Sequence, residues 1–347
     1  MIESMRKLTR VAACGLAWLL LATVCLAVDR VKLTTGAQQT GDITGSTPTE
    51  LTLEIGATKK QLPVNELESV QFEGEPTGLT QARMAIAGGR YAEAAAQLAK
   101  VPQGGLKRPL LNQEVQFYQA LTSARLALGG SGSIQDAGKR MLAFEKSNPT
   151  SFHYFAACEA LGDLLVAMGN FPVAESYYTK IASAPWPEYK LKAAALSGRA
   201  LVGQKKYDQA IARFDQVLAS DLQGSQMSAQ KAAARLGKAE ALSGSEKSRE
   251  AVALVDEVIA NAGPDEDELL ARAYNVKGAS LQAAGQVKPA IVAYLHVDLL
   301  YPRFPAIHAE ALSHLAELFA TDNKTQRAAQ ARSTLKQKYP QSSWANR

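Results

Sequence analysis

The chain has 347 residues and a formal net charge of +5, and 20% of its residues are charged. Residues 1–27 hold three basic residues and one acidic residue, so the rest of the chain carries only +3, too mild a charge to predict nucleic-acid binding. Cys14 and Cys25 also lie in that segment. Cys158 is then the one cysteine left, which excludes an internal disulfide in the rest of the chain.

The first 27 residues are predicted to be a signal peptide. Arg6, Lys7 and Arg10 form a basic start, an apolar stretch follows over residues 11–26, and small residues precede a cleavage point after Ala27. Two alternatives are a retained membrane anchor and lipidation of Cys25. No later apolar run is long enough to span a bilayer. We therefore expect an exported protein, periplasmic or secreted, without a membrane span after cleavage.

Residues 28–75 are predicted to form a small β-rich module. Apolar and polar residues alternate in short runs such as Leu51, Leu53 and Ile55, and glycines lie between the runs where turns are expected. About five strands in so short a segment indicate a strongly bent sheet. The order of strands and turns loosely resembles a small Sm-like or SH3-like barrel. We interpret the module as structural.

Residues 79–343 are predicted to be helical and repetitive, after a boundary marked by Gly74, Pro76 and Gly78. A unit containing Gly162, Ala174 and Tyr178 returns thirty-six residues later, and again near Gly278. One small residue marks every unit. These alanines are Ala94, Ala137, Ala174, Ala210, Ala251, Ala290 and Ala328.

This pattern resembles the tetratricopeptide repeat. In that family a small residue of the first helix faces an alanine of the second, because two helices cross closely only where side chains are small. The resemblance implies a mainly α fold: a right-handed α-solenoid of about seven helical hairpins. It also implies that large residues wedge into the next hairpin, and these are Leu98, Met141, Tyr178, Phe214, Val255 and Tyr294.

No catalytic or cofactor motif is present in the sequence. It lacks a phosphate-binding loop, a nucleophile elbow, a zinc-protease motif and paired cysteines. His308 and His314 are six residues apart on one predicted helix, which is a poor spacing for a metal pair, and we expect both on a solvated surface. Cys158 is expected to be a buried, inert thiol. The sequence therefore predicts a protein that is not an enzyme and has no catalytic residues, metal or cofactor.

The repeat resemblance also implies that the first helix of each hairpin lines a concave groove. Mapped onto that face, the chain predicts a groove that is basic in its middle and acidic at both ends, suited to a protein or peptide with acidic groups. The basic and polar positions are Lys192, Arg199, Lys231, Lys238, Arg272 and Asn275. The acidic positions are Glu159, Asp163, Glu310 and Glu317.

The best functional interpretation is an exported scaffold that binds a partner protein or peptide. The repeat ends Tyr301-Pro302 and Tyr339-Pro340-Gln341-Ser342 resemble those of periplasmic repeat proteins that serve cell-envelope assembly. The main alternative is a binding protein for cell-wall polysaccharide, which needs exposed aromatic residues in the groove. A third is an enzyme whose site forms only on folding. Sequence leaves the partner and the oligomeric state open.

Overall fold

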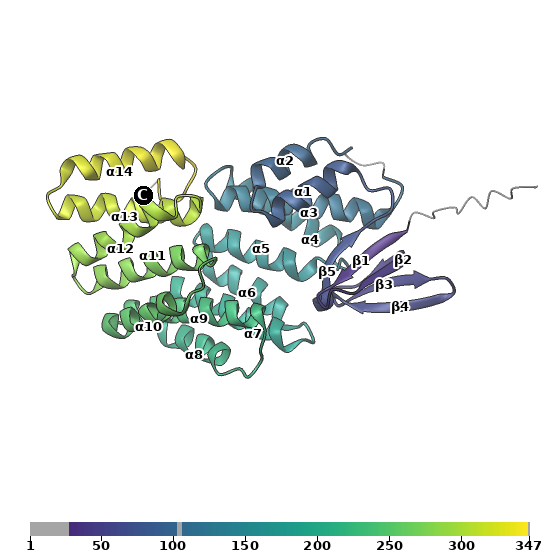
Figure 1. The fold of residues 1–347 in the computed structure, drawn as a ribbon, viewed down its shortest axis with the longest axis horizontal. Coiled ribbons are helices and arrows are strands. Elements are labelled where there is room, and N and C mark those ends of the chain that lie inside the picture. Colours follow the sequence, from purple (N-terminus) through teal and green to yellow (C-terminus); the bar gives the residue numbers. More distant parts are fainter. Residues whose placement is uncertain (1–27, 103–105, 346–347) are drawn as a thin grey trace, which may run out of the picture.

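The protein folds as a small β-sheet followed by a long helical array (Figure 1). The computed structural model describes residues 28–102 and 106–345, so the predicted leader lies outside the described residues. The predicted all-β module is confirmed, and a 3₁₀ turn, Val64–Glu66, precedes its last strand. The strands are β1 (Asp29–Leu33), β2 (Gln38–Ser46), β3 (Glu50–Ile55), β4 (Thr58–Pro63) and β5 (Leu67–Gln71).

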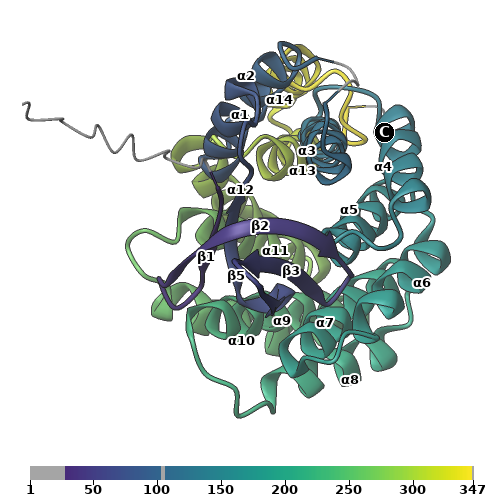
Figure 2. The ribbon, with the colours of Figure 1, turned by 90° about the vertical axis from the view of Figure 1, so that its right-hand side faces the viewer.

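The sheet is antiparallel, with the strand order β4-β3-β2-β1-β5. Alternate side chains face inward, so Val31, Leu51 and Leu53 are fully buried. The pairing register shifts between Ile43 and Gly45 where β2 meets β3, and again where β1 meets β5. Such irregularities bend a strand and increase its twist, which gives β2 the curvature seen in Figure 2.

The β module has no hydrophobic core of its own. Its inward residues form one continuous cluster with residues of the first helices, among them Leu79, Ala82 and Val115. Two further contacts reach later parts of the array. Ser46 Oγ donates a hydrogen bond to the Thr150 carbonyl oxygen at 3.1 Å, and Asn65 Nδ2 donates one to Glu188 Oε1 at 2.7 Å. The sheet therefore folds together with the helices.

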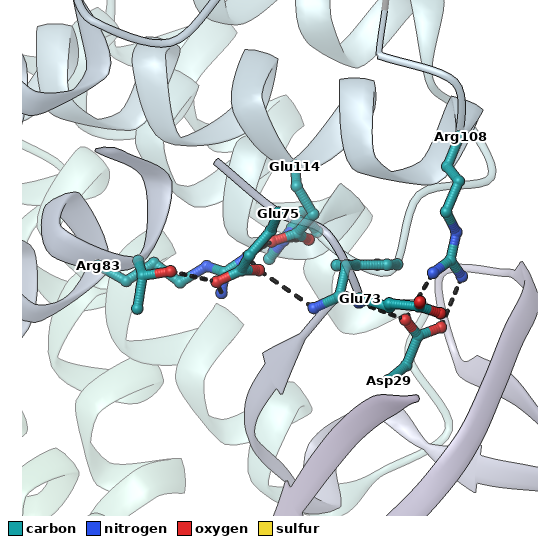
Figure 3. A network of polar contacts seen from close by, with 9 residues as sticks. Asp29, Glu73, Glu75, Arg83, Arg108 and Glu114 are labelled. Carbon is teal, nitrogen blue, oxygen red and sulfur yellow. Dashed lines mark hydrogen bonds and ion pairs between the residues drawn. The ribbon is translucent and has the colours of Figure 1, made fainter. Parts of the chain in front are cut away.

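A network of charged groups fixes the sheet to the helices (Figure 3). Asp29 is fully buried at the start of β1, and its carboxylate accepts hydrogen bonds from the backbone N–H groups of Ile43 and Glu73, each at 2.7 Å. The Arg108 guanidinium donates to both Asp29 oxygens at 2.5 Å. A buried carboxylate needs such partners to offset its desolvation.

A second group of charges lies beside the first. Arg83 donates to Glu75 at 2.9 Å and to Glu114 at 3.2 Å, and Glu114 contacts His153 Nε2 at 2.5 Å. Burial lowers the pKa of Arg83, but Glu114 and Glu75 outweigh burial, so the pKa is raised. Because the two carboxylates share one guanidinium, the linker before the first helix is tied to the first two hairpins.

The fourteen helices of the described residues pair into seven antiparallel hairpins, which confirms the predicted solenoid. Three of them begin with proline, at Pro109, Pro187 and Pro305, where the missing N–H has no helical partner to lose. The helices are α1 (Thr77–Ala87), α2 (Tyr91–Leu98), α3 (Pro109–Leu128), α4 (Ile134–Ser147), α5 (Tyr154–Ala167), α6 (Phe171–Ala182), α7 (Pro187–Gly203), α8 (Tyr207–Leu218), α9 (Ser225–Gly244), α10 (Ser248–Asn261), α11 (Asp267–Ala283), α12 (Val287–Leu300), α13 (Pro305–Thr321) and α14 (Thr325–Lys338).

All seven marker alanines are buried, six of them completely and Ala328 to within 1%. The glycine of the first helix, however, makes room for an aromatic ring. A methyl group on Gly162 would lie 2.1 Å from Tyr178 Cε1. A methyl group on Gly198 would lie 2.7 Å from the Phe214 ring, and one on Gly278 would lie 2.7 Å from the Tyr294 ring.

Repeats without an aromatic residue at that place tolerate a methyl group. Leu98 of the first hairpin is paired with Ala82, and Val255 of the fifth is paired with Ala239, both alanines fully buried. The choice between glycine and alanine in the first helix therefore follows the size of the wedge residue in the second.

The array winds into a coil whose last hairpin returns to the second one (Figures 1 and 2). The turn after α3 contacts the C-terminal segment. A methyl group on Gly130 would lie 3.4 Å from Ser342 Cβ and 3.6 Å from Tyr339 Cβ, and one on Gly129 would lie 3.9 Å from Pro305 Cβ. We call this the end-to-end contact.

His308 corrects one sequence expectation, because it is buried rather than solvated, with 1% of its surface exposed. Its Nε2 contacts Asp298 Oδ1 at 2.8 Å, and its Nδ1 contacts the Tyr339 hydroxyl at 2.7 Å. These bonds join α12, α13 and the segment after α14. The tyrosine of the Tyr-Pro-x-Ser end thus has a structural role here.

Candidate binding face on the inner side of the coil

The odd-numbered helices form the inner side of the coil. They contact one another in succession, as α7 does with α9 and α9 with α11, and Figure 2 shows them inside the even-numbered helices α4, α6, α8 and α10. This arrangement agrees with the expectation that first helices line the concave face. We call the surface formed by α5, α7, α9, α11 and α13 the inner face.

Backbone geometry at the turns fixes which residues of each hairpin are equivalent. In six hairpins one residue with a left-handed φ of 57–73° lies five positions before the buried alanine. Three of these residues are not glycine. The turn residues are Gly89, Gly169, Lys205, Glu246, Gly285 and Asn323.

This register corrects the fifth hairpin. Counted back from Glu246, the residue equivalent to Gly162 and Gly198 is Ala239 and not Gly237. Glu240 therefore takes the inner position that the sequence mapping gave to Lys238. Gly237, two residues before Ala239, lies against the ring of Phe214 in the preceding hairpin.

Lys231 and Lys238 accordingly make contacts with the preceding hairpin. Lys238 Nζ is paired with Asp215 of α8 at 2.6 Å, and Lys231 Nζ donates to the Ser220 carbonyl oxygen at 2.6 Å. Both lysines are held by the outer helix α8 and the loop that follows it. Their predicted place on the inner face was therefore wrong.

Arg199 lies on the inner face between two acidic helices. Its guanidinium donates to Asp163 at 3.1 Å, and Asp163 also accepts a hydrogen bond from the Tyr178 hydroxyl at 3.0 Å. Desolvation by the groove walls lowers the pKa of Arg199, but Asp163, Tyr178 and Glu240 outweigh it and the pKa is raised. Its side chain is still 40% exposed, so donors remain available.

Glu240 is the acidic residue that the sequence mapping missed. It is exposed on the inner face but surrounded by the coil, and this desolvation raises its pKa, with Arg199 and Arg272 opposing the rise. Arg272 is also paired with Glu268 at 2.7 Å, one helical turn away. The only sequence signal for Glu240 was the spacing of the fifth hairpin.

Two more predicted residues contact the neighbouring inner helix. Lys192 of α7 pairs with Glu159 of α5 at 2.5 Å. Asn275 of α11, which is 4% exposed, donates to Glu310 of α13 at 3.1 Å. The inner face is therefore not a basic stripe between acidic ends, because acidic and basic groups alternate and pair from helix to helix.

The described residues give little support to the other kinds of site. They contain no group of three or more histidine, cysteine, aspartate or glutamate residues that could hold a metal ion. Trp186 packs against Tyr189, with ring centroids 4.8 Å apart. Within the same part of the chain, no helix has the length and apolar character to cross a membrane.

The helical part has the fold of tetratricopeptide-repeat proteins. Residues 195–267 match the sequence profile of the tetratricopeptide repeat family, and the paired helices, buried alanines and repeated turns extend the same organisation through the array. No curated protein matches the sequence significantly.

Solved structures show the same fold at low sequence identity. A tetratricopeptide repeat protein from Parabacteroides merdae is 15% identical with a TM-score of 0.52, and the match covers 78% of this chain and 96% of that one. A Rap protein complexed with competence and sporulation factor is 14% identical with a TM-score of 0.55, covering 77% of this chain and 76% of that one.

Proposed function

We propose that this protein is an exported scaffold, periplasmic or secreted, whose inner face binds an acidic segment of a partner protein. The observation that carries the proposal is the set of half-exposed cations on that face. The side chains of Lys192, Arg199 and Arg272 are 33%, 40% and 55% exposed. Each has one carboxylate partner and further N–H donors, and an arginine offers five.

An acidic segment fits this face better than a neutral one. Since each cation already balances one carboxylate, a further anion gains most near arginine, whose planar fork binds two acceptors at once. The Rap protein that shares this fold was solved in complex with competence and sporulation factor. A complex formed by another protein of this fold supports the proposal that this chain also binds a partner. We further propose a role in cell-envelope assembly.

The binding test compares two double variants that remove the same charge from different places. Partners are captured from envelope extracts of the source cell and identified, and the affinity of one purified partner is then measured. Arg199→Gln with Arg272→Gln removes cations from the inner face. Lys231→Gln with Lys238→Gln removes two cations that the outer helix α8 and its following loop hold.

We expect the inner-face variant to bind at least about tenfold more weakly, and the control variant to bind within about twofold of the original. Binding should also weaken as salt rises toward about 0.5 M, because screening shortens the reach of the charges. Equal affinities of the two variants would refute the inner face as the binding surface.

Export has its own test, independent of binding. The mass of the protein recovered from outside the cytoplasm should correspond to a chain that begins at Val28. A mass that includes residues 1–27, or that carries acyl chains on Cys25, would contradict cleavage after Ala27.

A further inference from the structure

The last outer helix, α14, differs in charge from the other outer helices. It contains four basic residues and no acidic one. By contrast, α10 contains one basic and three acidic residues, and α8 contains one basic and two acidic residues. The outer surface of the coil is therefore mixed in sign along α8 and α10 and purely positive along α14. The basic residues of α14 are Arg327, Arg332, Lys336 and Lys338.

The outer helix before it, α12, exposes large apolar side chains. Val292, Leu299 and Leu300 are 54%, 71% and 59% exposed. Val292 and Leu299 are seven positions apart, which places them on the same face of the helix. Single exposed leucines are common on protein surfaces. Among the described residues, however, no other helix exposes more than one large apolar side chain.

A chain of hydrogen bonds brings the ends of these two helices together. His308 contacts Asp298 of α12 at 2.8 Å and the hydroxyl of Tyr339, which follows α14, at 2.7 Å. Leu299 follows Asp298 directly in the chain, and Lys338 precedes Tyr339 directly. The exposed leucines and the last cations of α14 therefore lie at one edge of the array. We call this surface the outer edge, and it consists of Leu299, Leu300, Arg332, Lys336 and Lys338.

The cations of the outer edge face solvent, and the nearby acidic residues of these hairpins have other partners. Arg332, Lys336 and Lys338 are all exposed. Asp298 contacts His308, and Asp322 pairs with Lys324 at 2.6 Å. A terminal repeat needs a polar outer surface to stay in solution, and cations alone would serve that purpose. Two leucines exposed beside them work against it, so the combination indicates a ligand that takes both.

We propose that the outer edge binds the surface of an anionic lipid bilayer. Leucine side chains enter the boundary between head groups and acyl chains, while lysine and arginine pair with anionic head groups. A soluble polyanion would use the cations but gain nothing from the leucines. The surface also lies on the outer side of the coil, at the end of the array opposite the β module, where a flat ligand can reach it (Figure 1).

This contact goes beyond the proposed function, because none of its residues lies on the inner face. The test is flotation of the purified protein with liposomes of neutral phosphatidylcholine, alone or with about one part in four of anionic phosphatidylglycerol. Every variant carries the same N-terminal segment, so differences between variants report the changed side chains alone.

Two pairs of variants separate this surface from exposed charge and exposed apolar area in general. Lys336→Gln with Lys338→Gln removes two cations from the outer edge, and Arg213→Gln with Arg249→Gln removes two exposed cations from α8 and α10. Leu299→Gln is matched by Met84→Gln on α1, because Met84 is 66% exposed. Thermal melts check that each variant is folded.

We expect the protein to float with the anionic liposomes and to stay in solution with the neutral ones. Since each cation near an anionic surface contributes about fivefold to the affinity, loss of Lys336 and Lys338 should weaken binding at least about tenfold. Leu299→Gln should weaken it about fivefold, because the leucine no longer enters the bilayer. Both control variants should bind within about twofold of the original protein. Salt at about 0.5 M should release the protein from the liposomes.

Three results would overturn the proposal. The first is equal flotation with neutral and anionic liposomes, or none with either. The second is flotation that the Lys336 and Lys338 variant retains, or that Met84→Gln weakens as much as Leu299→Gln does. The third is binding of soluble polyphosphate without flotation, which would assign the cations to a soluble polyanion. Partner capture that depends on Arg199 and Arg272 is unaffected by all three, so the proposed function fails or stands separately.

Discussion

Replacing Gly162 by alanine tests the rule that glycine faces the aromatic wedge. The new methyl group would lie 2.1 Å from Tyr178 Cε1 and 2.6 Å from Cζ. The ring has nowhere to move, because Tyr178 is fully buried and its hydroxyl is bound to Asp163. Overpacking costs about 1–3 kcal/mol, and alanine regains about 1 kcal/mol of helix propensity. With so short a contact, we expect a net loss of about 1–2 kcal/mol.

Gly138 in α4 provides the matched control, since a methyl group there meets only Met168 Cε at 3.8 Å. Gly138→Ala should stabilise the protein by about 0.5–1 kcal/mol. The same substitution, glycine to alanine, is thus expected to stabilise the protein at Gly138 and to destabilise it at Gly162. Adding Tyr178→Leu to Gly162→Ala should recover part of the loss, because Ala82 and Leu98 already form such a pair.

Two measurements would decide this prediction. Denaturant midpoints compare overall stability, and amide exchange in α5 and α6 reports the affected hairpin directly, which matters because repeat arrays unfold in parts. If Gly162→Ala is as stable as the original protein, or if the losses of Gly162→Ala and Tyr178→Leu simply add, the assigned packing is wrong.

Three further results are expected. Tyr178→Phe should lower the free energy of unfolding by about 1.5–3 kcal/mol, since it removes a hydrogen bond to a carboxylate. Tyr294→Phe should be neutral or stabilising, because the Tyr294 hydroxyl has no hydrogen-bond partner. Equal losses of stability for the two variants in melting experiments would contradict this. Arg108→Met should destabilise the protein by about 2–3 kcal/mol, because fully buried Asp29 keeps its two backbone donors but loses its cation. An unchanged denaturant midpoint would show that the ion pair of Arg108 and Asp29 does not stabilise the fold. Burial raises the pKa of Cys158 to about 11, so iodoacetamide at pH 8 should label the thiol only when the protein unfolds. The stability that comes from keeping this thiol neutral is fully present below the ordinary pKa of 9.0 and is lost as the pH rises through about 11.

The hairpins could be predicted from the sequence because their signals are local. A buried alanine recurs in all seven units and a large apolar or aromatic residue follows it four positions later in six of them, and both depend on contacts within one hairpin. The fifth hairpin was misplaced because Glu246 adopts a left-handed turn that glycine usually marks. Without that marker, Lys238 was mapped to the inner position that Glu240 holds, and Glu240 was missed.

Long-range contacts could not be predicted in the same way. The sequence predicted a β module at residues 28–75, but its strand residues Leu51 and Leu53 share one cluster with Leu79 of the first helix, and no local pattern records that contact. The pairing of Arg199 with Asp163 likewise depends on how neighbouring hairpins are rotated. The partners that neutralise the charged residues could therefore not be read from the sequence.

The end-to-end contact has a consequence for how this array can change in size. In a linear array each terminal unit has a neighbour on one side only, so it frays first, and units can be added or lost with modest effect. Here the turn at Gly130 supports the last hairpin through Tyr339 and Ser342. Inserting or deleting one hairpin would carry the last hairpin past this turn. The number of repeats is thus set by closure of the coil, and duplication of a single unit, the usual route by which such arrays lengthen, would leave both ends exposed.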